Sequence, residues 1–159
     1  MDCSQCQAMT KAGTRCKMKT CRQYPYCWVH LKSIDKLQVK NSTIRGAGKG
    51  LFYVGKNDFP KNKRITEYSA RTISLQPNPR TDYDLKVSEN RYLDSSSPLN
   101  YVGRYINDAR GTGKSTNVRF TKGTRIYEKN NRYSVPIYTK KKIKPNTELL
   151  MSYGRTYWD

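Results

Sequence analysis

The stretch E-L-L-M-S-Y-G-R-T-Y-W, residues 148–158, decides the fold of this chain. The apolar residues 149–151 predict a short buried strand, and Gly154 allows the turn that follows it. Three aromatic side chains surround that turn: Tyr153, Tyr157 and Trp158. Taken alone, the stretch also fits a terminal strand that closes a core with an aromatic plug. Its role therefore has to be decided from the motifs upstream.

The length and charge of the chain set the first bounds. With 159 residues it can form one ordinary domain and a small appendage. It has no apolar run of about eighteen residues, and its polar start, M-D-C-S-Q-C, is unlike a signal peptide. We therefore expect a soluble, intracellular protein without membrane contact. The 31 Lys and Arg residues against 12 Asp and Glu give a net charge of +19, which favours nucleic acid or another polyanion as a neighbour.

The cysteines predict a zinc site near the N-terminus. All five cysteines precede the only histidine, His30, which lies shortly after the last of them. The cysteines are Cys3, Cys6, Cys16, Cys21 and Cys27. Disulfides are disfavoured in a chain without an export signal, whereas thiolates beside an imidazole are typical ligands of tetrahedral zinc. A tail with free thiols is the alternative.

The segments C-Q-A-M-T-K-A-G-T-R-C-K and Y-C-W-V-H resemble a short Cys/His finger found as an accessory module in many intracellular proteins. The resemblance implies these ligands: Cys6, Cys16, Cys27 and His30. Spacing leaves open that Cys3 or Cys21 replaces one of them. Residues 1–33 hold too few aliphatic side chains to fold unaided, so the metal would supply the folding energy. Four protein ligands would make this zinc structural, because no position is left for water or substrate.

Beyond this module the pattern predicts a β-rich domain over residues 34–159. Short alternating segments predict strands, and residues 83–93 predict a hairpin that turns near residues 88–90. The predicted strands are residues 37–43, 51–54, 64–68 and 71–75. Between the first two lies R-G-A-G-K-G, whose glycines let the backbone approach a ligand closely.

The order of four motifs resembles the SET-domain lysine methyltransferases. These motifs are G-K-G-L-F, then E-Y, then R-Y-I-N-D-A with a following N-V, then E-L-L-M-S-Y-G. The resemblance covers residues 37–158 and implies an α+β, mainly β fold. That fold is a SET domain of short curved sheets with a C-terminal pseudoknot, in which the segment of Tyr153 threads beside that of Asn107. A small N-terminal zinc-binding module would precede it.

Carried over to this chain, the resemblance implies a site for S-adenosylmethionine and a narrow lysine channel. The catalytic residues would be Tyr153, which positions the amine, and Tyr68, which limits its rotation. The residues implied for the cofactor are Lys49, Gly50, Leu51, Arg104, Tyr105, Asn107, Asp108, Tyr153 and Trp158. The residues implied for the substrate channel are Tyr68, Tyr105, Met151, Tyr153 and Tyr157.

Three features depart from the family pattern. The family commonly has His at the position of Asp108 and Gly at that of Ala70. The Cys-rich segment that often follows the domain is missing, as in compact SET proteins of large DNA viruses. One wall of the channel would then come from Tyr157 and Trp158, from a second subunit or from the ligand, and the viral proteins suggest a homodimer.

The resemblance thus implies a protein-lysine N-methyltransferase that acts on chromatin, modifying a histone or a histone-like DNA-packaging protein. Its net charge fits a basic tail presented on DNA or a nucleosome better than a free tail. The nucleus or a site of viral replication is the expected location. The alternative is a catalytically inactive SET-like protein that contains zinc and binds nucleic acid or serves as a scaffold.

Overall fold

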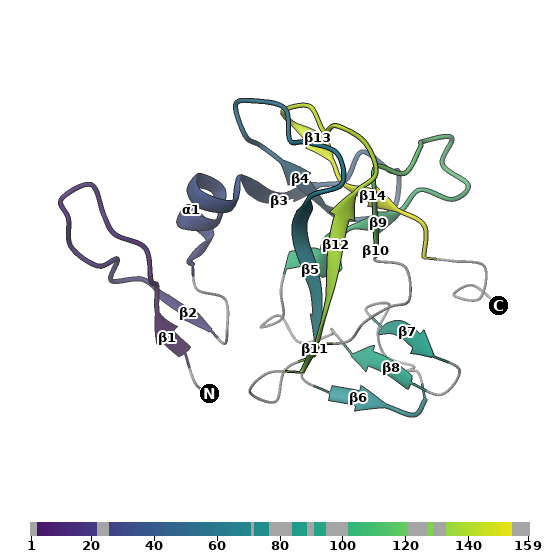
Figure 1. The fold of residues 1–159 in the computed structure, drawn as a ribbon, viewed down its shortest axis with the longest axis horizontal. Coiled ribbons are helices and arrows are strands. Elements are labelled where there is room, and N and C mark those ends of the chain that lie inside the picture. The colour runs from purple at the N-terminus through teal and green to yellow at the C-terminus, as the bar shows by residue number, and fades with distance from the viewer. Residues whose placement is uncertain are drawn as a thin grey trace.

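The computed structural model of the 159-residue chain describes most of the sequence, with gaps. The described residues are 3–21, 26–70, 72–76, 84–88, 91–94, 102–120, 127–128 and 133–153. Within these ranges the protein consists mainly of short strands, which confirms the predicted mainly β fold (Figure 1).

The strands follow the chain in fourteen short segments of the described residues. They are β1 (Cys3–Gln5), β2 (Lys19–Cys21), β3 (Leu37–Asn41), β4 (Lys49–Tyr53), β5 (Arg64–Ala70), β6 (Thr72–Ser74), β7 (Asp84–Ser88), β8 (Arg91–Asp94), β9 (Asn107–Asp108), β10 (Val118–Phe120), β11 (Tyr127–Glu128), β12 (Tyr133–Thr139), β13 (Thr147–Glu148) and β14 (Leu150–Met151). Three short helical segments join them: α1 (Trp28–His30), the π-helical η1 (Leu31–Asp35) and the 3-10 helix η2 (Val102–Tyr105). None of the described helices is long and apolar enough to cross a membrane.

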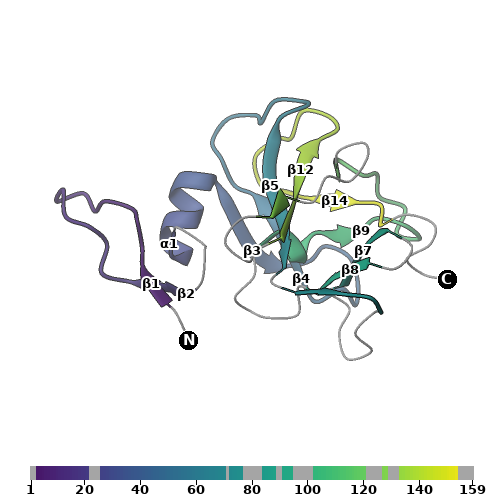
Figure 2. The ribbon, with the colours of Figure 1, turned by 60° about the horizontal axis from the view of Figure 1, so that its bottom comes forward.

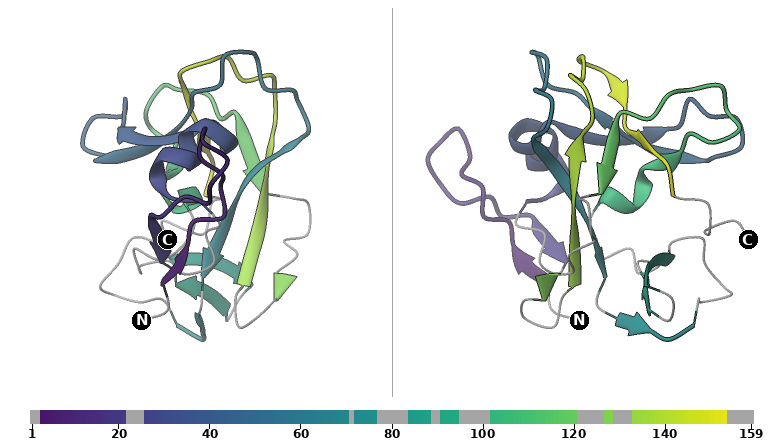
Figure 3. Two further views of the ribbon diagram at one scale, coloured as in Figure 1. Left: turned by 90° about the vertical axis from the view of Figure 1, so that its left-hand side faces the viewer. Right: turned by 45° about the vertical axis from the view of Figure 1, so that its right-hand side comes forward.

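The largest sheet is built around β12, which pairs with β5 on one edge and with β10 and β11 on the other. Figure 3 shows β5 and β12 running side by side. β5 begins at the predicted residue and extends two residues beyond Tyr68, because its last residues still pair with β12. The interior of β12, Val135 and Ile137, is fully buried.

A second sheet has the order β13-β4-β3, and its register sets Lys40 opposite Gly50. The two strands predicted here are confirmed, with shifted ends. β3 stops before Thr43 because the N–H of Ser42 donates to the carbonyl of Gly48 at 2.8 Å and closes the glycine loop. β4 takes in Lys49 and Gly50, so the end of that loop is itself strand.

The predicted hairpin is also confirmed. β7 and β8 pair antiparallel, and β6, within the predicted strand 71–75, joins the free edge of β8. Leu93 and Leu85 are its buried side chains. Residues 89–90, at the predicted turn, lie outside the described residues.

The strand predicted at residues 149–151 is present as β14. β14 pairs in parallel with β9, with Leu150 opposite Asn107 and Met151 opposite Asp108 (Figure 2). All other strand pairs among the described residues are antiparallel. A late segment of the chain is thereby placed alongside a middle one.

Two separate hydrophobic clusters hold the described residues together. The larger is centred on the sheets and includes Leu51, Leu149 and Leu31, the first residue of η1. The smaller consists of buried residues before α1, with Tyr26 packed against it. Residues 31–35 form a π-helical turn, and its first residue, Leu31, is buried in the main core.

Candidate functional site

The site is assembled where β4, β9 and β14 meet. The side-chain amide of Asn107, on β9, donates to the backbone carbonyl of Lys49 on β4 at 2.9 Å. Beside it, the parallel pair β9–β14 leads directly to Tyr153. Three segments far apart in sequence, each carrying residues predicted for the cofactor site, are therefore joined by hydrogen bonds.

The orientation of the Asn107 amide follows from its partners. Its Nδ2 faces two acceptors, the Lys49 carbonyl and the Oε1 of Glu148 at 3.3 Å. Because both partners can only accept, the NH2 group must point at them and Oδ1 must point away. No described residue donates to that oxygen. Asn107 thus offers a fixed acceptor next to the glycine loop.

Glu148 is the buried centre of this arrangement. One carboxylate oxygen accepts from the hydroxyl of Ser42 at 2.6 Å, and the other accepts from the backbone N–H of Thr43 at 2.8 Å and its hydroxyl at 2.5 Å. With Asn107 as a fourth donor group, the carboxylate joins the start of the glycine loop to β9. The side chain is 6% exposed, so these contacts are shielded from water.

The pKa of Glu148 reflects this environment. Burial alone would raise the pKa, but hydrogen bonds from Ser42, Thr43 and Asn107 to the ionised form outweigh it and lower the pKa below its ordinary value of 4.5. Gly50 makes room for the carboxylate. A Cβ at that position would lie 2.3 Å from Glu148 Oε1, so a side chain there would displace it.

The glycine loop itself faces open space. Gly46 and Gly48 have φ angles of +80° and +68°, a region that favours glycine. A Cβ on either would meet no described atom within 4 Å. The backbone of this loop is therefore accessible to a ligand from the side where side chains would normally stand.

Asp108 holds the segment of Tyr153 in place. Its Oδ2 accepts from the backbone N–H of Tyr153 at 3.2 Å, and its Oδ1 accepts from the N–H of Arg110 at 2.7 Å. The carboxylate does here what a neutral ring could not do in the same way, since it accepts from two N–H groups at once. This departure from the family pattern therefore has a structural use in the chain.

The hydroxyl of Tyr153 donates to the carbonyl of Ile106 at 2.5 Å. Because the proton is directed at that carbonyl, the phenol oxygen can act toward any further partner only as an acceptor. Tyr153 packs partly buried against the main core, and Ile106 is 1% exposed. Asp108 on β9 thus holds the backbone of Tyr153, and Ile106, the residue before β9, holds its side chain.

The other residues predicted for the channel lie on neighbouring elements. Tyr68, on β5, is buried and packs edge-on against Phe120, with ring centroids 6.4 Å apart. Gly103, on η2, has backbone so close to β5 that a Cβ would lie 2.1 Å from the carbonyl oxygen of Glu67. That contact sets η2 against the strand of Tyr68.

Two further predicted residues lie on η2, and one on β14. The guanidinium of Arg104 donates to the hydroxyl of Tyr105 at 2.7 Å and stacks over its ring at 4.7 Å. Met151 is 2% exposed and directly precedes the Ser152–Tyr153 pair. Leu51, on β4, is fully buried, and its carbonyl accepts from the N–H of Leu149 at 2.7 Å. Tyr157 and Trp158 lie outside the described residues.

Sequence reasoning missed Glu148 as a functional residue, although it opens the quoted motif. Its partners Ser42 and Thr43 lie more than a hundred positions upstream, so no local pattern connects them. Asn117 was only part of a quoted motif. Its buried amide donates to the carbonyl of Glu148 at 2.8 Å and accepts from the N–H of Leu150 at 2.8 Å, which fixes the chain on both sides of Leu149.

The N-terminal module gathers a second set of chemical groups. The thiols of Cys6, Cys16 and Cys27 and the ring of His30 offer ligand atoms that all lie within 4.8 Å of one another. The three thiols are buried, and the ring is partly exposed. Cys3 and Cys21 face each other in the β1–β2 register, and their side chains are not described.

The geometry of this cluster fits zinc. Nδ1 of His30 lies 3.5 Å from the sulfur of Cys6 and 3.2 Å from that of Cys27. Bond lengths of about 2.3 Å to sulfur and about 2.05 Å to nitrogen place tetrahedral S and N ligands about 3.5 Å apart. The backbone N–H of Cys27 also donates to the Cys6 sulfur at 3.3 Å, a contact typical of a bound thiolate.

Comparison with known proteins adds the family. The model of the SET domain family matches residues 48–154, which include β4, β9, β14 and Tyr153. No curated protein matches the chain.

Solved structures share the fold at low identity. Polycomb repressive complex 2 (PRC2) of Chaetomium thermophilum is 20% identical, with a TM-score of 0.54 over 76% of this chain. A humanized mutant of that complex bound to the inhibitor GSK126 is 22% identical, with a TM-score of 0.57 over 74% of the chain. An active PRC2 in the stimulated state is 20% identical, with a TM-score of 0.53 over 74%. The match spans only 15% of the length of each of these chains.

Proposed function

The chain belongs to the SET domain family, whose members are generally protein lysine methyltransferases, and we propose that it is such an enzyme, using S-adenosylmethionine. One observation carries the proposal. The parallel pairing of β14 with β9 brings Tyr153 into contact with Ile106 and Asp108, and the side chain of Asn107 between them is bonded to the glycine-loop strand. The family's cofactor and lysine sites require this junction.

The residues around the open glycine loop suit the cofactor. The exposed backbone at Gly48 can approach the methionine part, and the fixed Oδ1 of Asn107 can accept from its ammonium group. Lys49, Gly50 and Leu51 would line this end, with Arg104, Tyr105 and Asp108 further along. When bound, S-adenosylmethionine supplies a methyl group activated by a sulfonium. Trp158 and Tyr157 stay proposed contacts of the cofactor and the channel, respectively.

The substrate lysine must arrive neutral. An ordinary lysine pKa of about 10.4 lies roughly three units above physiological pH, so deprotonation costs about 4 kcal/mol. A channel lined by Tyr68, Tyr105, Met151 and Tyr153 would lower that pKa by desolvation, and the nearby positive charge would lower it further. No strong general base is then required.

Tyr153 orients the amine for transfer. Its hydroxyl is held by Ile106, so its oxygen lone pairs can accept from the amine and hold the nitrogen in line with the methyl group. With the cofactor held at the glycine loop, the amine nitrogen that Tyr153 orients would receive the methyl group from the sulfonium, and the methylated amine would release its proton to water. Tyr68, packed on Phe120, would limit rotation of the amine.

A basic protein tail is the proposed substrate class, as in a histone or a histone-like DNA-packaging protein. The net charge of +19 repels a free basic tail but attracts one that is presented on DNA. The structural relatives are named as polycomb repressive complexes. We therefore propose a substrate displayed on chromatin, with contact to the DNA itself.

The N-terminal cluster would bind one structural zinc through Cys6, Cys16, Cys27 and His30. The module is small, and its buried residues are chiefly these cysteines, so the metal would hold it together. It would add no chemistry to methyl transfer, because four protein ligands complete the coordination shell.

Calorimetry with S-adenosylmethionine, followed by label transfer to core histones and nucleosomes, tests the proposal. We expect one cofactor per chain and label transfer that falls by about 100-fold in Tyr153→Phe. Salt-sensitive DNA binding without any cofactor heat would instead support the inactive scaffold, which the net charge fits equally well.

A further inference from the structure

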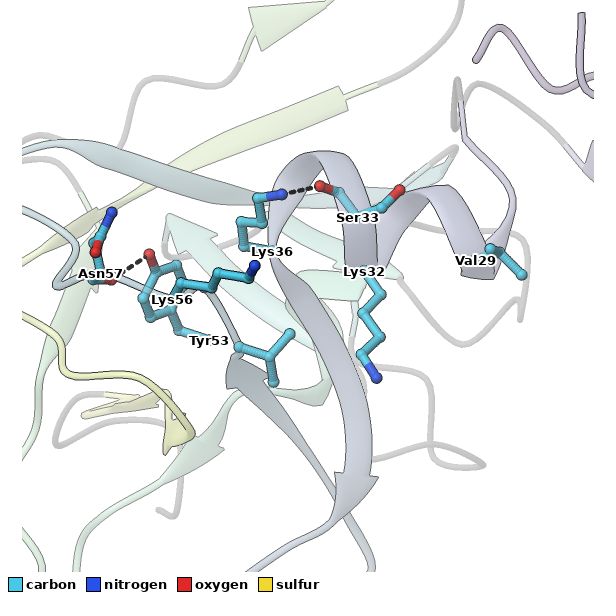
Figure 4. A pocket seen from close by; sticks show the side chains of 9 residues that line it. Val29, Lys32, Ser33, Lys36, Tyr53, Lys56 and Asn57 are labelled. Atoms are coloured by element: carbon cyan, nitrogen blue, oxygen red, sulfur yellow. Dashed lines mark hydrogen bonds between the residues drawn. The ribbon is translucent and has the colours of Figure 1, made fainter. Parts of the chain in front are cut away.

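A groove lies between the helical turn that follows the zinc ligands and the end of β4. One wall is formed by Val29, Lys32 and Lys36, and the other by residues 53–57 (Figure 4). The groove has a volume of about 580 Å³. It lies at the other end of β4 from the cofactor junction, because Tyr53 is the last residue of β4 whereas Lys49 and Gly50 are its first.

The groove is built into the fold. The N–H of Val54 donates to the carbonyl of Lys36 at 2.7 Å, so the two walls are joined by a backbone hydrogen bond. Leu31 anchors the helical turn in the main core. On the other wall the hydroxyl of Tyr53 donates to the carbonyl of Asn57 at 2.7 Å, which fixes the turn that carries Lys56.

Three ammonium groups border this groove, and no acidic residue lines it. Lys32, Lys36 and Lys56 are all exposed, and Figure 4 shows Lys56 reaching across Tyr53 toward the helical turn. Lys36 donates to the carbonyl of Ser33, which holds its ammonium at the rim. The acid that follows in sequence, Asp58, lies 3.9 Å from Lys142 and so faces another partner.

We propose that this groove binds the phosphate backbone of duplex DNA. Three lysines line a preformed hollow that has no carboxylate in its lining, so an anion in the groove would be attracted to their positive charges. A regular row of phosphates can meet several of them together, releasing counterions. The proposal goes beyond methyl transfer and does not depend on it.

Duplex DNA fits better than an acidic peptide. The whole chain carries +19, so attraction to a polyanion continues beyond the groove.

Val29 belongs to the short helix that ends in the ligand His30, and Lys32 follows two residues later. One wall of the groove is therefore ordered together with the proposed zinc site.

Fluorescence anisotropy of a labelled 20-base-pair duplex, measured over a series of salt concentrations, tests the proposal. The groove variant is Lys32→Gln/Lys36→Gln/Lys56→Gln in the full zinc-loaded chain, without cofactor or histone. The matched control removes the same charge from exposed lysines elsewhere: Lys61→Gln/Lys63→Gln/Lys144→Gln. An all-arginine version of the groove triple keeps the charge and checks that the surface tolerates substitution.

If each groove lysine neutralises one phosphate, the slope of log affinity against log salt should fall in magnitude by about 2.7. The arginine triple should keep the original slope. The proposal is supported if the magnitude of the slope falls at least twice as much in the groove variant as in the control variant. Any smaller difference overturns it, as does polyglutamate binding more tightly than the duplex and losing that binding in the groove variant.

Discussion

The hydroxyl group of Tyr153 makes a structural contact and is also proposed to take part in the chemistry. Tyr153→Phe removes the hydroxyl bond to Ile106, which should cost about 1 kcal/mol of stability. It also removes the acceptor for the amine, so methyl transfer should fall by about 100-fold while cofactor affinity stays near its original value. Label transfer measures the loss of methyl transfer, and calorimetry measures the cofactor affinity. Tyr138→Phe, on β12, is the matched control and should keep full activity.

Glu148 should make stability depend on pH. Its folded-state pKa lies below 4.5, so its contribution is complete above the unfolded-state pKa and is lost as the pH falls through the folded-state pKa. Glu148→Gln replaces an acceptor with an NH2 group that faces the donors of Thr43, so the variant should lose about 2 kcal/mol at pH 7.

Urea unfolding of the wild type and of Glu148→Gln between pH 3 and pH 7 measures this, and the two curves should converge at low pH. Asp58→Asn, an exposed carboxylate near Lys142, should change the curve little. An equal gap between Glu148→Gln and the wild type at every pH would contradict the assigned role of the charge.

Individual site residues were predictable only where a motif carried them. Asn107 and Tyr153 lie in quoted motifs, and the structure brings them to adjoining strands. Glu148 also lies in a motif, but its function depends on Ser42 and Thr43. Such a contact is created by the tertiary fold, so periodicity and spacing do not contain it.

At the scale of the elements, β4 depends on the space that one glycine, Gly50, leaves for Glu148. Gly50→Ala would place a methyl group against the Glu148 carboxylate and force it from the Ser42 and Thr43 donors. We expect a loss of about 1 to 3 kcal/mol and a clear loss of cofactor affinity. Thermal unfolding and calorimetry test this.

Gly113→Ala is the comparison for that variant, since Gly113 has a positive φ but open space around it. Its cost should be about 1 kcal/mol of backbone strain, without an effect on the cofactor. Similar cofactor affinities in the two variants would show that the space at Gly50 is not needed for the site.

Some strands were easier to predict from the sequence than others. The hairpin of β7 and β8 was predicted because its turn and its alternating residues are local. The central strand β12 was not predicted, although its pairing with β5 is the longest among the described residues. It contains Pro136 and runs buried for three residues, so it shows no alternation.

At the scale of the molecule, zinc should control one part and leave the rest intact. We expect one zinc per chain by elemental analysis, and none in Cys27→Ser. Chelation should expose the amides of residues 3–21 to rapid hydrogen exchange, because the small cluster has no other core. The amides of β5 and β12 should stay protected.

Cys3→Ser and Cys21→Ser are the controls for the ligand set. If Cys6, Cys16, Cys27 and His30 are the ligands, both variants keep one zinc. Loss of the metal in either would bring that cysteine into the coordination shell. Metal-free protein purified without chelator would rule out the zinc assignment altogether.

The parallel pairing of β9 with β14 also bears on how the protein is made. Contacts between distant segments form slowly, because a long loop must close before they yield any stabilisation. β14 is the last strand among the described residues, and it leaves the ribosome after every other one. The sheets built from earlier strands can therefore form first, and the junction that carries Asn107 and Tyr153 is assembled last among the described elements.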